Sequence, residues 1–516
     1  MKKKNIFYYL NHKNLIGEIE HFGYVFSPKK LMITYFLMIC GSLLAAWLFK
    51  LHAPEYVIIC AAAILITPVL IHHSYRAMYE QRRFSDASRY LEKMLYYFKA
   101  HNKIITALEN VEQVFHDGNM KNTISQAIEY IHTQDDTLLN KKIKNAFKDT
   151  QNERTVEAKA LKIIEMAYPN KRIKRMHEFF LMVEQNGGNP NLGIEMQIKE
   201  REDWVNDVVK QQKDRTYIRT IFIYFSLIMI GICMFILYIP AIYPVFKFDL
   251  SDYVLVRIAS LLVIIITLAL YTKLSNVIGK SWLENDIKDD DAKQEAFYYK
   301  VINYAFKKER TKSLLYAFVS VVITGILYIL TANKMIIIAG GLFSFFLATS
   351  YKTGYSMGKK QLAKRMQTAF SDWVMQITLL MQFNNVPVSI AQSYDTAPGI
   401  LKPEIREMLV ALDAEPTSPV PYNNFGKNVN LSSVNEVMNT LYSVQNAFGA
   451  DVEREIDAIF EQNRKLNESI SEQHRKDKKA ANEIYLFLEV GAGCVLLIVD
   501  LVFMVVCFMS MTVNLI

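Results

Sequence analysis

The last apolar stretch of the chain, IYLFLEVGAGCVLLIVDLVFMVVCFMSM at residues 484–511, decides the fold class. A helix needs about 20 apolar residues to cross the hydrocarbon core of a bilayer, and only an internally hydrogen-bonded backbone is stable there. This stretch is long enough. It follows directly on a charged segment, AIFEQNRKLNESISEQHRKDKKAANE at 458–483. The sequence therefore predicts a long amphipathic helix that continues into a membrane span.

Six further apolar stretches reach or approach this length. They cover residues 31–49, 56–71, 221–242, 253–271, 314–330 and 335–350. Neighbouring stretches are separated by short loops, so they form three helical hairpins at 31–71, 221–271 and 314–350. The sequence predicts an all-α membrane protein with about seven transmembrane helices, the last at 484–511.

Charge placement gives the orientation in the membrane. The chain has 516 residues, of which 51% are hydrophobic and 21% charged, and its formal net charge is +8. Lysines are concentrated in the amphipathic N-terminal segment 1–30 and in the linker 272–313, whereas the loops near His52, Lys247 and Lys334 are nearly bare of charge. Short cationic segments stay on the cytoplasmic side. We therefore expect a multi-pass membrane protein with a cytoplasmic N-terminus and an outward C-terminus. Arg257, near an outer membrane surface, is expected to snorkel.

The two long polar regions, 72–220 and 351–483, resemble each other. Each contains Phe-Ser-Asp, and Ser85 and Ser371 in this motif are potential N-caps for a new helix. Each then breaks at asparagine and resumes with another amphipathic helix. A later glycine break, at Gly187 and Gly188 in the first copy and at Gly449 in the second, precedes a charged helix that enters a span. The sequence thus predicts two repeated cytoplasmic helical-bundle domains.

These features resemble the type II secretion F-domain family, to which the platform proteins of type IV pili and Tad pili belong. The resemblance rests on the helix pairs after Phe-Ser-Asp, the glycine breaks, the charged helices that enter spans, and Ile239-Pro240-Ala241-Ile242 at the end of the third span. It covers nearly the whole chain, as a TadB-like half joined to a TadC-like half. The first helical pair departs from the common glycine pattern of the family.

The resemblance implies a non-catalytic platform that couples a cytoplasmic motor ATPase to the assembly of pilin-like subunits. The implied partners are this ATPase, the pilin-like subunits, other inner membrane assembly proteins, the lipid bilayer and further copies of the same chain. A secondary transporter with internal repeats is the alternative, because repeats and an intramembrane aspartate also occur in transporters.

The sequence shows no clear motif of a common enzyme or cofactor site. All five cysteines lie in apolar stretches, so neither a disulfide framework nor a metal site is expected. The segment 354–360 is one residue short of a phosphate-binding loop and lacks its Ser or Thr, and an exit linker is the better interpretation. The basic patch at Lys171, Arg172, Lys174 and Arg175 lacks aromatic residues for base stacking, so lipid headgroups or a motor protein are preferred over nucleic acid. No catalytic residue, cofactor or metal ligand is assigned.

Two carboxylates inside the last span are the candidate functional residues. Glu489 and Asp500 are eleven residues apart, about three helical turns along one face. A carboxylate in hydrocarbon is costly unless it is paired or protonated, so a functional or assembly role is the default hypothesis. Because the span is longer than the hydrocarbon core is thick, Glu489 can instead lie at the cytoplasmic interface.

Overall fold

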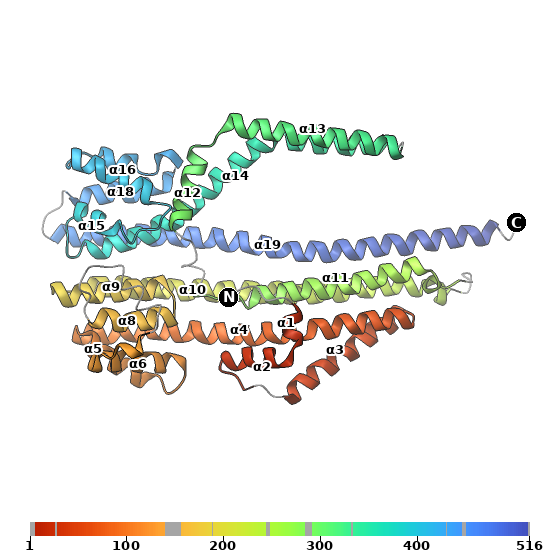
Figure 1. Ribbon diagram of the computed structural model, residues 1–516, viewed down its shortest axis with the longest axis horizontal. Coiled ribbons are helices and arrows are strands. Elements are labelled where there is room, and N and C mark those ends of the chain that lie inside the picture. The colour runs from red at the N-terminus through yellow and green to blue at the C-terminus, as the bar shows by residue number, and fades with distance from the viewer. Residues whose placement is uncertain are drawn as a thin grey trace. The chain divides into compact units, whose positions relative to one another are not determined.

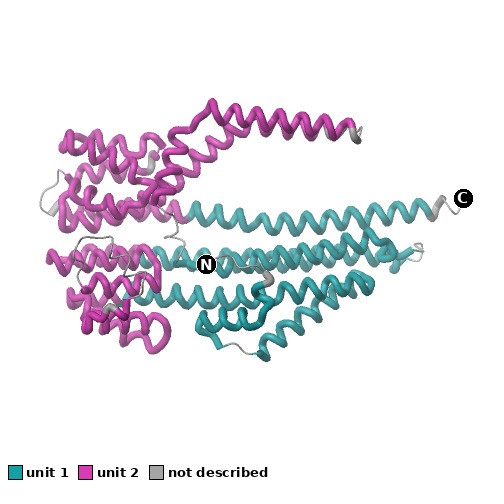
Figure 2. The backbone as a smooth tube through the Cα atoms, in the orientation of Figure 1, with its two compact units in different colours: residues 1–93, 201–285, 472–516 teal, residues 94–200, 286–471 magenta. Residues whose placement is uncertain are grey.

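The computed structural model describes residues 6–25, 28–139, 156–187, 189–243, 248–283, 291–331, 334–429, 431–445 and 450–513. Helices, turns and short loops account for these residues, and no strand occurs among them. The chain divides into two compact units (Figure 2), each made of segments that are separate in sequence. Unit 1 consists of Met1–Lys93, Arg201–Asn285 and Glu472–Ile516, and unit 2 consists of Met94–Glu200 and Asp286–Ser471.

Four long helices dominate the chain (Figure 1). They are α4 (Ala53–His101), α10 (Asn191–Ile242), α14 (Lys334–Leu380) and α19 (Ala450–Val513). The longest, α19, has 64 residues. At about 1.5 Å per residue it is about 95 Å long, roughly three times the thickness of a hydrocarbon core. The predicted continuation of a charged helix into a span is therefore confirmed for α19, and also for α10.

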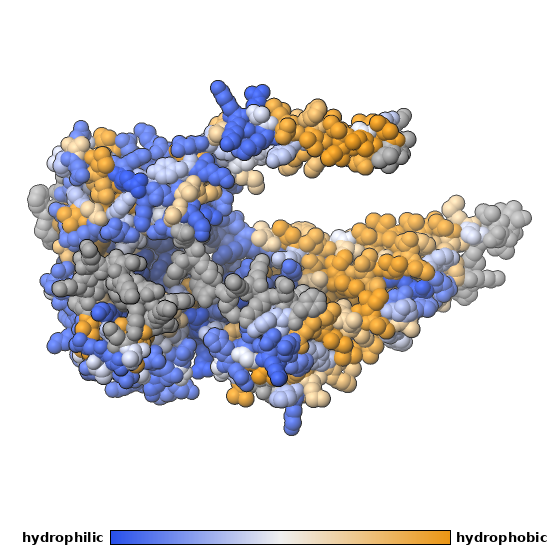
Figure 3. All heavy atoms as spheres, in the orientation of Figure 1, coloured by the Kyte–Doolittle hydropathy of each residue, from blue (hydrophilic) through white to orange (hydrophobic). Residues whose placement is uncertain are grey.

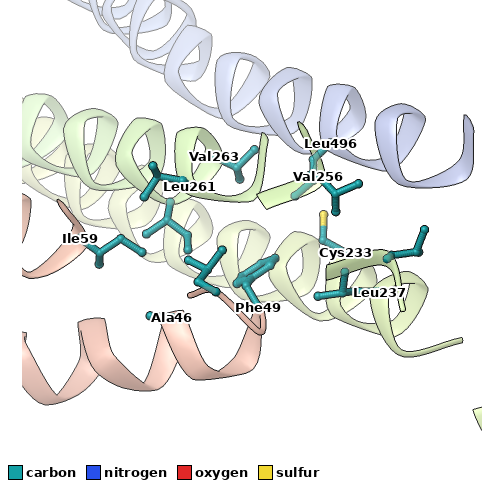
Figure 4. Close-up of a cluster of buried hydrophobic side chains, with 12 residues drawn as sticks. Ala46, Phe49, Ile59, Cys233, Leu237, Val256, Leu261, Val263 and Leu496 are labelled. Carbon is teal, nitrogen blue, oxygen red and sulfur yellow. The ribbon is translucent and has the colours of Figure 1, made fainter. Parts of the chain in front are cut away.

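Unit 1 contains most of the apolar helices. Besides parts of α4, α10 and α19 it has α1 (Ile6–Leu10), α2 (His12–His21), α3 (Pro28–Leu48), η2 (Leu250–Asp252) and α11 (Val254–Ile278). Buried side chains from α3, α4, α10, α11 and α19 form one apolar cluster (Figure 4), which includes Ala46, Ile59, Cys233, Val256 and Leu496. Because these residues come from five apolar helices, the cluster holds the spans of unit 1 together.

Unit 2 contains the shorter amphipathic helices and one apolar hairpin. Its helices, besides α14 and parts of α4, α10 and α19, are α5 (Ile104–Val114), α6 (Asn119–Thr133), η1 (Asp136–Leu138), α8 (Val156–Ala167), α9 (Lys171–Asn186), α12 (Asp291–Ile302), α13 (Phe306–Thr331), α15 (Val386–Ser393), α16 (Lys402–Ala414), α17 (Val420–Asn424), η4 (Lys427–Val429) and α18 (Ser432–Gln445). Aromatic rings fill its core: Phe98 stacks on Phe180 with centroids 3.8 Å apart, and Trp373 stacks on Phe425 at 5.2 Å. Full burial of one such side chain contributes about 1.5–3 kcal/mol.

Among the described residues, six helices are long and apolar enough to cross a membrane. They correspond to the predicted spans at 31–49, 56–71, 221–242, 253–271, 314–330 and 484–511. Large hydrophobic side chains cover their outer surfaces (Figure 3), with Phe36 at 67% and Phe487 at 74% exposure. Apolar surfaces of this extent are typical of contact with lipid. The fold is thus that of an all-α, multi-pass membrane protein.

The seventh predicted span, 335–350, is helical but is not among these six. It forms the first part of α14 and packs against α13. A Cβ atom at Gly340 would lie 2.2 Å from Thr324 Cγ2, and the hydroxyls of Ser344 and Ser320 are 3.1 Å apart. Small residues that allow two helices to approach closely are common in membrane hairpins. The hairpin itself is present, and its crossing of the membrane stays a prediction.

The two predicted helix starts at Phe-Ser-Asp are wrong. Ser85 lies inside α4 and Ser371 inside α14, and both helices continue from apolar stretch to polar region without a break. Each serine is preceded by several turns of good helix, so its amide already has an intrahelical acceptor and no cap is needed. The predicted breaks at asparagine are confirmed: α4 ends one residue before Asn102, whose φ is +53°, and Asn385 caps α15 by accepting from the Val388 N–H at 3.1 Å.

The helices of the two polar regions follow α4 and α14 in a comparable order. In the first region α5, α6, α8 and α9 lead to α10, and in the second α15, α16, α17 and α18 lead to α19. This order is compatible with the predicted repeat of 72–220 and 351–483. Their descent from one repeated domain remains a prediction.

Candidate functional site

Both candidate carboxylates lie on the apolar part of α19 and are buried inside unit 1. Glu489 is 2% exposed and Asp500 is 1% exposed. Neighbouring helices of unit 1 therefore surround Glu489, and its location at the cytoplasmic interface of the membrane stays a prediction. The two side chains are turned toward the other spans of unit 1.

Glu489 has one close partner on α11. The Thr267 hydroxyl donates to Glu489 Oε1 at 2.7 Å. The buried hydroxyl of Ser226, on α10, lies beside the same carboxylate. Glu489 Oε2 has no hydrogen-bond partner within the described ranges. The site thus brings α10, α11 and α19 together around a carboxylate whose hydrogen-bonding capacity is only partly used.

Asp500 has even fewer polar neighbours. Its Oδ1 atom makes no hydrogen bond to any residue that the structure describes. Cys233 of α10 lies beside the part of α19 between the two carboxylates, because its thiol donates to the Gly493 carbonyl at 3.9 Å. Pairing and protonation are the two states in which a carboxylate is tolerated in hydrocarbon. Within the described residues the structure brings it no cation.

Gly493 sets the approach of α19 to α10 at this point. A Cβ atom there would lie 2.2 Å from Met229 Cε and 3.5 Å from Met229 Cβ. The close approach of backbones is the usual function of small residues between membrane helices. It places the thiol of Cys233 against the backbone of α19.

In and next to two loops of unit 1, at 49–52 and 248–253, charged side chains form ion pairs. Arg257 Nε lies 3.2 Å from Glu55 Oε1, and Lys50 Nζ lies 2.6 Å from Asp249 Oδ2. Burial would raise the pKa of Asp249, but the hydrogen bond from Lys50 lowers it below its usual value. Arg257 therefore connects the first turn of α4 to η2, where it donates to the Ser251 carbonyl at 3.2 Å, and its snorkelling stays a prediction.

The basic patch on α9 is not a free surface. Arg175 NH1 lies 2.9 Å from both carboxylate oxygens of Glu200, and Lys171 Nζ lies 2.7 Å from Asp372 Oδ2. Burial would raise the pKa of Asp372, but the charges of Lys171 and Arg175 hold it below its usual value. We call Lys171, Arg172, Arg175, Glu200 and Asp372 the ion-pair cluster. It connects α9, α10 and α14 inside unit 2, so the prediction of a lipid-binding or motor-binding patch is wrong for Arg175.

Of the predicted glycine breaks, only Gly187 lies in the described ranges; Gly188 and Gly449 lie outside them. Gly187 ends α9, and its N–H donates to the Val183 carbonyl at 2.9 Å. Its φ of +69° and ψ of −161° belong to a region that essentially only glycine adopts. The first break is confirmed, and its physical cause is this backbone conformation.

The segment 354–360 is part of α14, so its backbone N–H groups are engaged in the helix and cannot surround a phosphate. The exit-linker interpretation is also wrong, because the helix continues through it. Within the described ranges no group of three or more His, Cys, Asp or Glu residues is placed to hold a metal ion.

Comparison with protein-family models, with curated proteins and with solved structures finds no match.

Proposed function

We propose that this chain is a non-catalytic inner membrane platform of a type IV or Tad-like pilus, or of a type II secretion machine. It couples a cytoplasmic motor ATPase to the assembly of pilin-like subunits. It works as a homo-oligomer together with other inner membrane assembly proteins.

The observation that carries this proposal is the continuity of α10 and α19. Each helix begins in unit 2, which contains the short amphipathic helices, and continues without a break into an apolar stretch of unit 1. Every turn of such a helix is hydrogen-bonded to the next, so a displacement at one end can be passed to the other. This suits a protein that transmits the work of a separate motor, and the polar regions offer that motor a large surface.

A secondary transporter remains the alternative, and the buried carboxylates are the observation that favours it. Transporters keep polar and ionisable residues near the middle of the membrane. Transporters, however, generally have interrupted helices and small loops, whereas here the apolar helices are continuous and the polar regions are large.

The continuity of α19 can be tested directly. Gln473 is exposed and lies in the charged segment of α19, between the residues of this helix that belong to unit 2 and its apolar stretch. Gln473→Pro removes one helix hydrogen bond and kinks or breaks the helix, at a cost of about 3 kcal/mol or more, while Gln473→Ala keeps the helix. We expect the proline variant to reach the membrane and to bind the motor normally but to assemble no filaments, with the alanine variant unchanged. Normal filament assembly by Gln473→Pro would contradict the coupling model.

Partners and activity separate the two functions. Affinity purification of the solubilised full-length protein from its own cells should recover a hexameric ATPase and pilin-like subunits. The pure protein should hydrolyse no ATP. ATP turnover that is lost in Lys359→Ala would refute the non-catalytic platform. Gradient-driven solute uptake into proteoliposomes that is lost in Asp500→Asn would favour the transporter.

A further inference from the structure

Unit 1 contains a cavity of about 450 Å³ between α10, the end of α11 and α19. Its size lies within the range of about 300–1,000 Å³ typical of small-ligand sites. Its lining residues are Gln211, Asp214, Arg215, Ile218, Val277, Lys280, Arg475, Lys478, Lys479, Ala481 and Asn482. Five of them are Lys or Arg, and Asp214 is the one acid of this lining. The cavity is therefore strongly cationic.

The single acid of the lining is already engaged. Asp214 Oδ2 lies 3.3 Å from Arg475 NH1. Lys479 lies over the ring of Tyr217, 5.4 Å from its centroid, and Lys478 Nζ lies 3.4 Å from Gln211 Oε1. The contact with the Tyr217 ring leaves the charge of Lys479 in place. An anionic ligand would supply the negative charge that the lining lacks.

Arg215 is the residue that points most clearly to a ligand. It is 91% buried, since only 9% of its surface is exposed, and its guanidinium carbon lies 3.8 Å from the centroid of the Trp282 ring. Its NH1 atom makes no hydrogen bond within the described part of the chain. Burial lowers its pKa to about 10, so the guanidinium is still charged at neutral pH. A stacked guanidinium with an open donor is well suited to phosphate recognition.

The position of the cavity indicates what carries the phosphate. It lies where three apolar stretches end, at residues 221, 271 and 484. Ile218 of the lining belongs to a buried apolar cluster with Phe222 and Leu274. One to two turns further along α19, Phe487 and Leu488 are 74% and 52% exposed. A polar head in the cavity would thus continue into apolar surroundings, as in a phospholipid and unlike in free phosphate.

We propose that this cavity binds the phosphate headgroup of an anionic phospholipid, with Arg215 as its buried anchor and Lys280, Lys478 and Lys479 as outer cations. With the predicted orientation, the lipid belongs to the cytoplasmic leaflet. Such a lipid would fasten α10, α11 and α19 to one another at the membrane surface. The proposal does not depend on the proposed function, because binding can be measured without a motor or a filament.

Native mass spectrometry of the full-length protein in detergent, titrated with phosphatidylglycerol or phosphatidylcholine, tests this. We expect the protein to bind phosphatidylglycerol at least tenfold more tightly. A cation near a membrane surface changes binding to anionic lipid about fivefold, so Lys478→Gln combined with Lys479→Gln should weaken it by about 25-fold. Arg215→Gln should weaken it further; because Arg215 is buried and its variant can misfold, the two lysines give the decisive result.

A charge-matched control uses Lys476→Gln combined with Lys213→Gln. Both lysines are exposed neighbours on α19 and α10 that do not line the cavity. This control should bind phosphatidylglycerol within twofold of the wild type. Equal weakening by both double variants would show only general attraction of charge and would overturn the proposal. Equal affinity for both lipids would overturn the proposal too. So would full displacement of the lipid by 100 mM inorganic phosphate, a concentration far above a millimolar Kd, since soluble phosphate would then be the ligand.

Discussion

Replacing Arg175 should uncover how much of the stability of unit 2 depends on the ion-pair cluster. Arg175 is 8% exposed overall and bridges Glu200 on α10 and the Asp372 carbonyl on α14, the latter with NH2 at 3.3 Å. Arg175→Met keeps most of the side-chain volume but leaves two partly buried carboxylates, with side-chain exposures of 13% for Glu200 and 24% for Asp372, with less positive charge around them. Breaking a buried pair by removing one partner costs about 3–5 kcal/mol.

Hydrogen exchange measured by mass spectrometry on the full-length protein reports this cost locally. Since about 1.4 kcal/mol corresponds to a factor of ten, protection of the α9 amides should fall by about 100-fold to a few thousand-fold in Arg175→Met. Adding Glu200→Leu removes the carboxylate that has lost Arg175; Asp372 keeps Lys171 as its partner, while Arg172 loses its 3.4 Å contact with Glu200. The double variant should therefore recover part of the protection, because replacing a whole buried pair by apolar residues is often neutral.

Lys174→Met is the matched control. Lys174 Nζ lies 3.5 Å from Glu178 Oε1 on the same helix, and both side chains are exposed. Such surface pairs contribute about 0.3–0.5 kcal/mol, so protection should change by about twofold. A change below fivefold in Arg175→Met, or a double variant less protected than the single one, would refute the reasoning.

Four further predictions concern separate features. Burial would raise the pKa of Glu165, but the hydrogen bond and charge of His177 lower it to about 2 from 4.5. The ionised Glu165 therefore stabilises the fold by about 3 kcal/mol above pH 4.5, and this stabilisation is lost as the pH falls toward 2. Denaturation curves of Glu165→Gln and wild type should differ at pH 7 and converge near pH 2. Gly187→Ala should cost about 1–3 kcal/mol because of its backbone conformation, although no atom lies within 4 Å of the added Cβ; unchanged thermal unfolding would contradict this. In a background without other cysteines, an impermeant thiol reagent added to intact cells should label Asp252→Cys and not Asp413→Cys, and the reverse would invert the predicted topology. Asp500→Leu should make membrane insertion of the last span more favourable by about 2.5–3.5 kcal/mol, yet abolish filament assembly; normal filaments would show that Asp500 has no role in assembly.

The candidate site was predictable in part. The sequence located Glu489 and Asp500 inside an apolar span, because hydropathy along one helix is a local property. It did not predict that Thr267, Ser226 and Cys233 lie beside them, since these residues come from α10 and α11. Their only local signal was a polar or small residue within a span, and many such residues simply bond to their own helix.

The cationic cavity shows the same limit more sharply. Lys478 and Lys479 stand in the charged segment 458–483, which the sequence identified only as a helix that enters a span, and Lys280 stands in the linker 272–313. What the sequence alone could not provide was Arg215, more than 250 residues earlier, and the ring of Trp282 against it. A site assembled from three helices has no spacing pattern that a single stretch can reveal.

The sequence by itself determined the apolar spans, the continuity of α10 and α19, and the break at Gly187. These depend on the hydrophobicity of about 20 consecutive residues or on one backbone conformation, and both are encoded locally. The tertiary structure alone decided whether Ser85 and Ser371 start helices, and whether the cations of α9 face solvent or carboxylates. Those outcomes depend on which partners lie within a few ångströms, because Coulomb and hydrogen-bond energies fall off with distance in space and not with separation along the chain.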